Sequence, residues 1–331
     1  MKWLTDEVVD RLRTAIQLPD LTNTRYRAPH FIGSGGMGTV WLAEDTTLHR
    51  KVALKVLHFG DGAADSGSRL MREAHILAAL EHPNIVPIHD AGSLADGSLY
   101  YSMKYVEGER LDQWLSTGVS QMERTHLWLR IADAIAFAHS KGIIHRDLKP
   151  ENIMIGHFNE VLVMDWGLGK ILRNRDVTAA GGGTGSGPAA APIQANSHST
   201  GHGTVLGTPG YMAPEQESDG AVDERTDIYG LAGILVAMIA VEPRTSGSPR
   251  IHRVLMAICA KAMHRDPAQR YDSVLDLTSD VANYQADLPV RAYHENPIER
   301  LSRLIKKHRT AVVLVASYLL MRILLIFLAR S

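Results

Sequence analysis

The periodicity of the apolar residues changes about one third of the way along the chain. Before residue 110, short apolar runs of strand length alternate with turns, at 39–42, 52–57 and 98–103, and one helical pattern at 69–80 interrupts them. After that point helical spacing dominates, and the helices expected are 121–141, 227–241, 251–264 and 272–286. A β-rich half followed by a helical half predicts an α+β fold with two lobes.

Composition limits the functions that this chain can have. Its 331 residues suffice for one two-lobed domain with an additional segment, and 45% apolar with 21% charged residues is typical of a globular protein. The net charge of −1 gives no reason to expect nucleic-acid binding. The single cysteine, Cys259, excludes an intrachain disulfide.

A glycine pattern lies near the start of the β-rich half. Gly33, Gly35 and Gly38 form G-x-G-x-x-G, in which the missing Cβ atoms let backbone amides approach a phosphate. A dinucleotide-binding fold would place a strand before this pattern and a helix after it. Here the strand-like run 39–42 follows, which favours a glycine-rich hairpin, although a plain structural turn explains the pattern equally well at this point.

Two oppositely charged residues lie in apolar surroundings. Lys55 lies inside the apolar run 52–57, where an unpaired ammonium group would be costly to bury. Glu73 shares the apolar stripe of the helix expected at 69–80. The two charges can pair, either as a structural ion pair or as part of a catalytic site.

A third group of residues has the composition of a phosphoryl-transfer site. Asp147, Lys149 and Asn152 lie within six residues of one another, and Asp165 ends the apolar run 161–164. The Asp165 carboxylate and the Asn152 amide offer hard oxygen ligands for Mg²⁺. The Asp147 carboxylate can accept a hydroxyl proton, and Lys149 can neutralise phosphate charge.

With these motifs in this order, the chain resembles a Hanks-type serine/threonine protein kinase, in particular the membrane-tethered bacterial kind. The resemblance runs from about Tyr26 to Asp287. The stretch 207–215, with Thr208 and ending in Ala-Pro-Glu at Glu215, matches this family, as do Asp227 and Arg270.

The resemblance implies a two-lobed kinase-like fold with a β-rich N-lobe and a helical C-lobe. The expected divisions are an N-terminal helix and linker at 1–25, a kinase domain at 26–288 with lobes at about 26–106 and 107–288, a flexible insert at 179–203, a basic segment at 289–310 and a transmembrane helix at 311–329.

The resemblance also assigns roles, residue by residue. Asp147 is implied to be the catalytic base, Lys149 to steady the transferred phosphoryl group, and Lys55, paired with Glu73, to contact the α- and β-phosphates. Asn152 and Asp165 are implied to bind Mg²⁺, for which Mn²⁺ can substitute. The residues implied to bind ATP are Ile32, Gly33, Ser34, Gly35, Gly36, Met37, Gly38, Thr39, Val40, Ala53, Lys55, Met103 and Val106, and those with structural or regulatory roles are Arg146, Thr208, Glu215, Asp227 and Arg270.

Three features depart from the family pattern. Trp166 stands where Phe is more usual, and we expect it to keep the packing role. The insert 179–203 lengthens the activation segment, where Thr200 and Thr204 are the preferred phosphorylation sites, to be read by Arg146. After Glu242 the chain is short of one helix and its loops, which bears on substrate docking.

The C-terminal run 311–329 is apolar except for Arg322 and is long enough to span a bilayer as a helix. A central arginine costs roughly 2.5–3.5 kcal/mol on insertion scales, which the surrounding apolar residues can offset. Basic residues before the run predict a single-pass membrane protein with a cytoplasmic kinase domain. An amphipathic helix lying on the lipid or on the protein is the alternative.

These observations favour ATP- and Mg²⁺-dependent phosphoryl transfer to Ser and Thr hydroxyls of proteins, including the chain itself. A membrane-anchored, nucleotide-binding pseudokinase scaffold is the second hypothesis, motivated by the short region after Glu242. An NAD(P)-dependent oxidoreductase fails on the order of strands. The expected partners are ATP, protein substrates and membrane lipid, with a second copy of the chain as a candidate and no nucleic acid.

Overall fold

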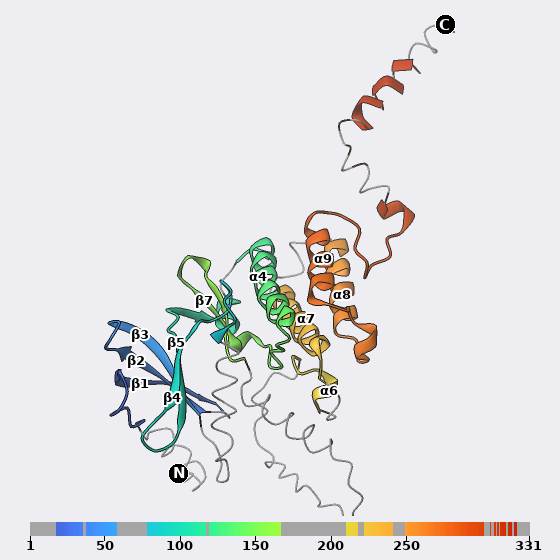
Figure 1. Ribbon diagram of the computed structural model, residues 1–331. Helices are drawn as coiled ribbons and strands as arrows, with labels where there is room; N and C mark the ends of the chain where they lie inside the picture. The colour runs from blue at the N-terminus through green and yellow to red at the C-terminus, as the bar shows by residue number, and fades with distance from the viewer. Residues whose placement is uncertain are drawn as a thin grey trace, which may run out of the picture.

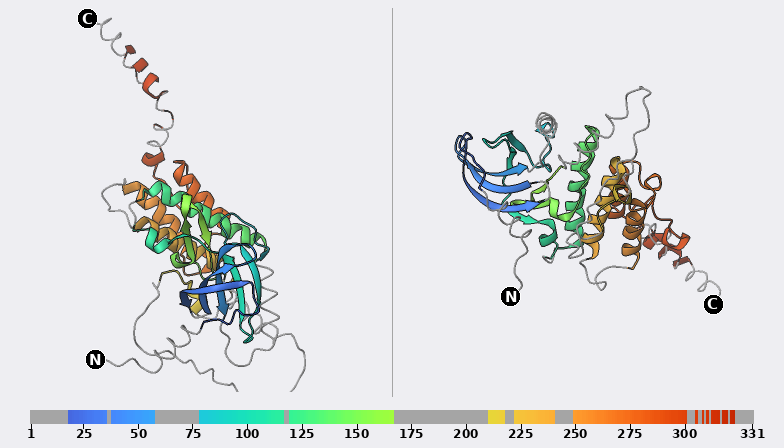
Figure 2. Two further views of the ribbon diagram at one scale, coloured as in Figure 1. Left: turned by 90° about the vertical axis from the view of Figure 1, so that its left-hand side faces the viewer. Right: turned by 90° about the horizontal axis from the view of Figure 1, so that it is seen from below.

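The computed structural model describes residues 18–35, 38–57, 78–116, 119–166, 210–217, 222–240 and 249–300, together with single residues and short stretches between 305 and 322. Strands gather at one end of the molecule and helices at the other, in all three views (Figures 1 and 2). The predicted two-lobed α+β fold is confirmed.

The N-terminal lobe is an antiparallel five-stranded sheet with the order β1-β2-β3-β5-β4. Its strands are β1 (Tyr26–Gly35), β2 (Gly38–Asp45), β3 (Arg50–Leu57), β4 (Ile88–Ser93) and β5 (Leu99–Lys104). The three strand-like runs of the sequence correspond to β2, β3 and β5. Because β3 lies between β2 and β5, its backbone is hydrogen-bonded on both sides.

The two faces of β3 belong to different apolar clusters. Val52, Leu54 and Val56 pack with Tyr26 and Trp41 on the outer face of the sheet. The alternate residues of the strand point to the opposite face, because successive side chains of a strand alternate. That inner face continues into the core of the helical lobe.

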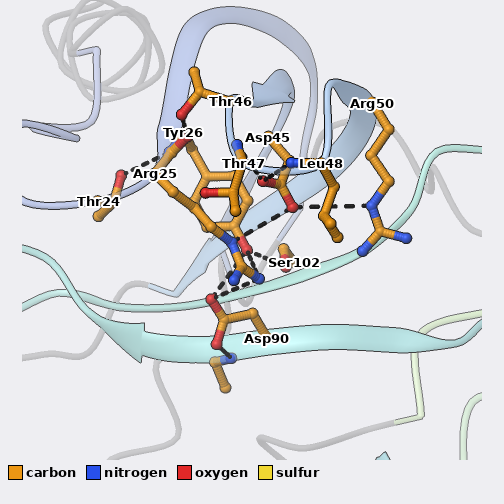
Figure 3. A network of polar contacts seen from close by, with 11 residues as sticks. Thr24, Arg25, Tyr26, Asp45, Thr46, Thr47, Leu48, Arg50, Asp90 and Ser102 are labelled. Carbon is orange, nitrogen blue, oxygen red and sulfur yellow. Dashed lines mark hydrogen bonds and ion pairs between the residues drawn. The ribbon is translucent and has the colours of Figure 1, made fainter.

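A polar network ties the start of β1 to the rest of the sheet (Figure 3). The Tyr26 hydroxyl lies 2.7 Å from the Ser102 hydroxyl and donates to Asp90 at 3.1 Å. Arg25 pairs with Asp90 at 3.1 Å and with the fully buried Asp45 at 3.4 Å. The chain segment before β1 is therefore held in the lobe by side-chain contacts as well as by the strand.

The C-terminal lobe is built around the long helix α4 (Gln121–Ser140). Ser120 and Glu123 form a capping box at its start, which satisfies amides that the helix leaves unpaired. Helices α7 (Glu224–Ala240) and α9 (Val274–Gln285) contact α4, and α8 (Pro249–Ala262) packs on both. Trp128 on α4 is fully buried and donates its indole N–H to the Leu231 carbonyl of α7 at 2.8 Å.

A small antiparallel sheet lies where the lobes meet, with the order β6-β7-β8. Its strands are β6 (Gly108–Arg110), β7 (Ile153–Gly156) and β8 (Val161–Val163), and β8 is linked to the N-terminal half through a bridge between Ile85 and Val163. The remaining short elements are α3 (Leu111–Trp114), α6 (Pro214–Glu217) and the 3-10 helices η1 (Pro150–Asn152), η2 (His157–Asn159) and η3 (Pro267–Gln269).

Several predicted segments lie outside the described residues. The helix predicted at 69–80 lies almost entirely outside the described residues, as do the N-terminal helix, the insert at 179–203 and the stretch 241–248 after α7. At the C-terminus, the described residues between 312 and 322 are helical and carry exposed apolar side chains. Within the part of the chain that is described, no helix has both the length and the apolar character needed to cross a bilayer.

Candidate active site

The segment after α4 brings three polar side chains together. Lys149 donates a hydrogen bond from Nζ to Oδ2 of Asp147 at 2.9 Å. The Asn152 side-chain amide donates to the Asp147 carbonyl at 2.7 Å and to its Oδ2 at 3.1 Å. Because the Asn152 nitrogen is used in these bonds, its side-chain oxygen is turned away from Asp147 and can face a cation. The predicted grouping of Asp147, Lys149 and Asn152 is thus present.

Asp227, near the start of α7, is bonded to the backbone of this segment. Its carboxylate is 1% exposed and accepts the backbone N–H groups of His145 and Arg146, each at 2.8 Å. Arg146 has a φ of 66°, in the left-handed region that is strained for a side chain with a Cβ. The two hydrogen bonds can hold this strained turn, and with it the direction in which Asp147 points.

His145 and Asn152 connect this segment to the strand that precedes Asp165. The Met164 amide donates to the Asn152 carbonyl at 2.8 Å, and the Met164 carbonyl accepts from His145 Nε2 at 2.8 Å. Complete burial lowers the pKa of His145, so the ring is neutral at neutral pH and carries its proton on Nε2. Asp165 follows with a φ of 57°, again left-handed. Two segments that carry predicted metal ligands are therefore joined by their backbones.

Lys55 joins the two lobes through an ion pair with Asp165. The Lys55 side chain is almost completely buried, whereas that of Asp165 is about 40% exposed. Burial acts to lower the pKa of Lys55, but attraction by Tyr101 and Asp165 more than offsets it and raises the pKa. The lysine therefore stays charged and can bind an anion. The other predicted partner, Glu73, lies outside the described residues.

Trp166 is buried and fulfils the packing role expected of it. Its indole donates to the Val163 carbonyl at 3.3 Å, and its ring lies 4.8 Å from that of His145. This aromatic contact fixes the backbone on both sides of Asp165.

The glycine pattern forms a hairpin between β1 and β2. Gly33 pairs with Val40, and Gly35 pairs with Gly38, in antiparallel register. This arrangement confirms the glycine-rich hairpin and excludes the strand-turn-helix of a dinucleotide-binding fold. Gly36 and Met37, at the tip, lie outside the described residues.

Other residues of the set implied to bind ATP lie where the inner face of the sheet meets the link to the helical lobe. Ala53 on β3 pairs directly with Met103 on β5, and both are buried. Val106 follows in the link between β5 and β6 and is also buried. Val40 lies opposite Lys55 in the adjacent strand. The remaining residues of this predicted set, Ile32, Ser34 and Thr39, belong to the hairpin strands.

Glu215 and Arg270 form a buried, bidentate ion pair within the helical lobe. Both Arg270 terminal nitrogens donate to Glu215 at 2.7 Å, and Thr226 donates to the same carboxylate at 2.9 Å. Both residues were assigned structural or regulatory roles by the resemblance, and this ion pair shows a structural contact between them. Thr208, Thr200 and Thr204 lie outside the described residues, so their roles stay predictions.

The oxygens of Asn152 and Asp165 fit a magnesium ion. Mg²⁺ in proteins commonly takes one or two protein oxygens and completes its octahedron with water and phosphate oxygens. No cluster of three or more histidine, cysteine or acidic side chains suited to a metal occurs among the described residues. Two protein oxygens leave positions for water and phosphate oxygens, so the donor set suits a cation that arrives with a phosphate ligand.

Sequence reasoning named one contributor to the site without its contacts and missed another. Asp227 was assigned a structural role by resemblance, without its contacts to the backbone of the catalytic segment. Tyr101 was seen only as part of a strand, although it lies directly opposite Lys55 in the β3–β5 ladder. The alternation of the strand 98–103 could have placed it on one face with Met103, but pairing with Lys55 depends on sheet register.

A two-lobed α+β domain with a glycine hairpin in one lobe, a lysine reaching across to Asp165, and Asp147 beside Asn152 defines the class of protein kinases. Residues 26–311 match the protein kinase domain family, which is more than half of the chain. The chain belongs to this family.

Its relatives include bacterial serine/threonine kinases. The chain is 34% identical over 297 residues to serine/threonine-protein kinase PknD of Protochlamydia amoebophila (strain UWE25), covering 78% of this chain and 30% of the relative. It is 33% identical over 282 residues to serine/threonine-protein kinase PrkC of Bacillus subtilis (strain 168), covering 78% of this chain and 40% of that one. The chain therefore spans less than half the length of these curated relatives.

The crystal structure of the Mycobacterium tuberculosis PknI kinase domain is similar in fold. It aligns with a TM-score of 0.58 at 24% identity and covers 81% of this chain and 98% of its own. This likeness agrees with the two-lobed architecture described above.

Proposed function

We propose that this chain transfers the γ-phosphoryl group of ATP to serine and threonine hydroxyls of proteins, including its own. The observation that carries the proposal is the meeting of Lys55, Asp165 and the Asp147–Asn152 segment at the junction of the lobes. Each residue type that phosphoryl transfer requires is present there.

In this reaction the protein mainly positions charges. Lys55 binds phosphate oxygens, and Lys149 neutralises charge that develops on the transferred group. The Asp147 carboxylate, held by Lys149 and Asn152, orients the acceptor hydroxyl and takes its proton. Mg²⁺, for which Mn²⁺ can substitute, supplies further neutralisation of the phosphates when it is held by Asn152 and Asp165.

A nucleotide-binding scaffold without transfer activity is the competing function. It was motivated by the short region after Glu242, which lies outside the described residues. The complete set of Lys55, Asp147, Asn152 and Asp165 favours the enzyme, because a scaffold has no need of the proton acceptor at Asp147.

The decisive experiment compares the full-length chain with its Asp147→Asn variant. Incubation with γ-labelled ATP, Mg²⁺ and a generic protein acceptor should label the acceptor with the natural chain, and Asp147→Asn should reduce the rate by at least about 100-fold while ATP still binds. Asp133→Asn is the matched control, because this aspartate is 71% exposed and its carboxylate contacts His82 at 3.3 Å. Equal labelling by wild type and Asp147→Asn would contradict the proposal.

We further propose that residues 311–329 attach the chain to a membrane as a single span, with the kinase domain on the cytoplasmic face. The support is the apolar run itself and the basic residues before it. Flotation of the full-length chain with lipid vesicles should be lost in Leu314→Arg/Leu319→Arg. Flotation of this variant to the same extent as wild type would argue against insertion.

Autophosphorylation at Thr200 and Thr204 belongs to the same proposal. A phosphate in the activation segment can be bound by Arg146, next to the catalytic base. Phosphosite mapping of the active chain should find one of the two threonines modified, and an active enzyme with neither modified would exclude this part. Association of two copies stays a prediction that crosslinking on vesicles can check.

A further inference from the structure

Lys55 has a neighbour in the sheet that the phosphoryl-transfer residues do not include. Tyr101 on β5 is the direct cross-strand partner of Lys55 on β3. Residues directly opposite each other in antiparallel strands project from the same face, with their Cβ atoms roughly 4.5–5.5 Å apart. Both side chains therefore point from the inner face of the sheet toward the junction of the lobes.

Tyr101 is a polar residue in an otherwise apolar part of this face. On either side of it along the strand, the inner-face residues are Leu99 and Met103, which are buried apolar side chains. Tyr101 itself is 5% exposed, and a buried phenol needs a polar partner for its hydroxyl. Among the described residues, the Lys55 ammonium group is the charged neighbour of this phenol: it lies 6.0 Å from the ring centroid, and the β3–β5 register keeps both side chains on one face.

Asp165 and Tyr101, two neighbours of Lys55 among the described residues, differ in where they are attached. Asp165 follows β8 in the small sheet at the lobe junction, so its distance from Lys55 depends on how the lobes are placed. Tyr101 is joined to Lys55 by the β3–β5 ladder and moves with it. If phosphates or a cation bind Asp165 and weaken its ion pair with Lys55, Tyr101 remains next to the lysine in the sheet.

We propose that Tyr101 is a positioning residue that holds the Lys55 ammonium group at the phosphate-binding end of the cleft. The proposal rests on the proposed function only in that Lys55 is taken to contact the phosphates of ATP. The hydroxyl keeps its proton at neutral pH, because burial raises the pKa of Tyr101 to about 12. It therefore orients the lysine as a neutral acceptor without competing as an anion for the phosphates.

The test measures nucleotide binding by the full-length chain, which needs no transfer activity. In Tyr101→Phe the ring and its packing stay and only the hydroxyl is lost. We expect the Kd for Mg-ATP to rise about five- to tenfold, the size of one charge-assisted hydrogen bond, while the Kd for adenosine changes less than about twofold because adenosine carries no phosphate. Tyr100→Phe is the matched control, since this neighbouring tyrosine faces the outer cluster and packs on Tyr26.

A double-mutant cycle identifies the route of the effect. In a Lys55→Met background, Tyr101→Phe should no longer change the Kd for Mg-ATP, because the group that it positions is gone. An equal effect in both backgrounds, an equal loss for adenosine, or unchanged or tighter ATP binding would overturn the proposal. Should the chain bind ATP but fail to transfer phosphate, the proposed function fails while this cycle still gives its answer.

Discussion

Asp227 accepts a hydrogen bond from the backbone of Arg146 across 81 residues of sequence. With the second bond to His145, it attaches the segment that carries the catalytic base to α7, a helix whose residues are mostly buried. The geometry of Asp147 thus depends on a carboxylate that is itself only 1% exposed.

We predict that Asp227→Asn lowers the free energy of unfolding by about 2–3 kcal/mol. The amide keeps one oxygen but presents an NH₂ group to one of the two backbone N–H donors, which leaves a buried donor unsatisfied. Urea denaturation measures the change in the free energy of unfolding. The rate of phosphoryl transfer should also be lower in the variant, measured at a temperature at which it is folded. Asp272→Asn is the control, because that side chain is 84% exposed, and it should change stability by less than about 0.5 kcal/mol.

The buried pair of Glu215 and Arg270 should be more costly to break. Arg270→Met leaves the Glu215 carboxylate buried without its cation, for which we expect a loss of about 3 kcal/mol in the free energy of unfolding. Adding Glu215→Gln to this variant should recover part of the loss, so the double variant is less destabilised than the sum of the single ones. The exposed pair of Arg291 and Asp276 offers the comparison, and Arg291→Met should cost less than about 1 kcal/mol.

The same pair predicts a dependence of stability on pH. Burial acts to raise the pKa of Glu215, but hydrogen bonds from Arg270, its own backbone and Thr226 offset it and hold the pKa below its ordinary value of 4.5. The contribution is complete above pH 4.5 and is lost as pH falls toward the lower pKa of the folded state, because the unfolded chain takes up the proton first. The difference in unfolding free energy between wild type and Glu215→Gln should therefore shrink below pH 4.5, and a difference that grows there would contradict this account.

The glycines of the hairpin should not be equivalent. A methyl group on Gly38 would collide with the Val56 carbonyl oxygen of the adjacent strand, whereas one on Gly33 meets no atom of the described residues within 4 Å. Gly38→Ala should lower the free energy of unfolding by about 1–3 kcal/mol, and Gly33→Ala should leave it within about 0.5 kcal/mol. Gly33→Ala should nevertheless weaken ATP binding, because the phosphates approach that backbone. Denaturation and nucleotide titration of both variants separate the two effects.

The sequence was most informative where the functional residues are close in the chain. Asp147, Lys149 and Asn152 fall within six positions, so one rigid loop is enough to bring them together, and the structure confirms their contacts. The periodicities of β2, β3, β5 and the four long helices likewise report local structure, and all were predicted to within a few residues.

Contacts that depend on register and packing could not be predicted in this way. Lys55 meets Tyr101 because β3 pairs with β5 in one particular register, which no local pattern specifies. The left-handed backbone at Arg146 and Asp165 could not be predicted from the sequence either. Neither residue is a glycine, and groups distant in the sequence stabilise the strained conformation. Asp227 could be recognised as important only through the family resemblance.

The polar network around Tyr26 has a consequence for choosing the N-terminal boundary of a truncated kinase domain. The family match starts at residue 26, yet Leu21 is buried and Arg25 supplies the nearer of two cations to the fully buried Asp45. A recombinant fragment trimmed at the boundary of the match would lose that cation, and Arg50, 3.8 Å away, would be left as the remaining counter-charge. A fragment for expression should therefore begin before residue 18, so that Leu21 and Arg25 keep their contacts with the lobe.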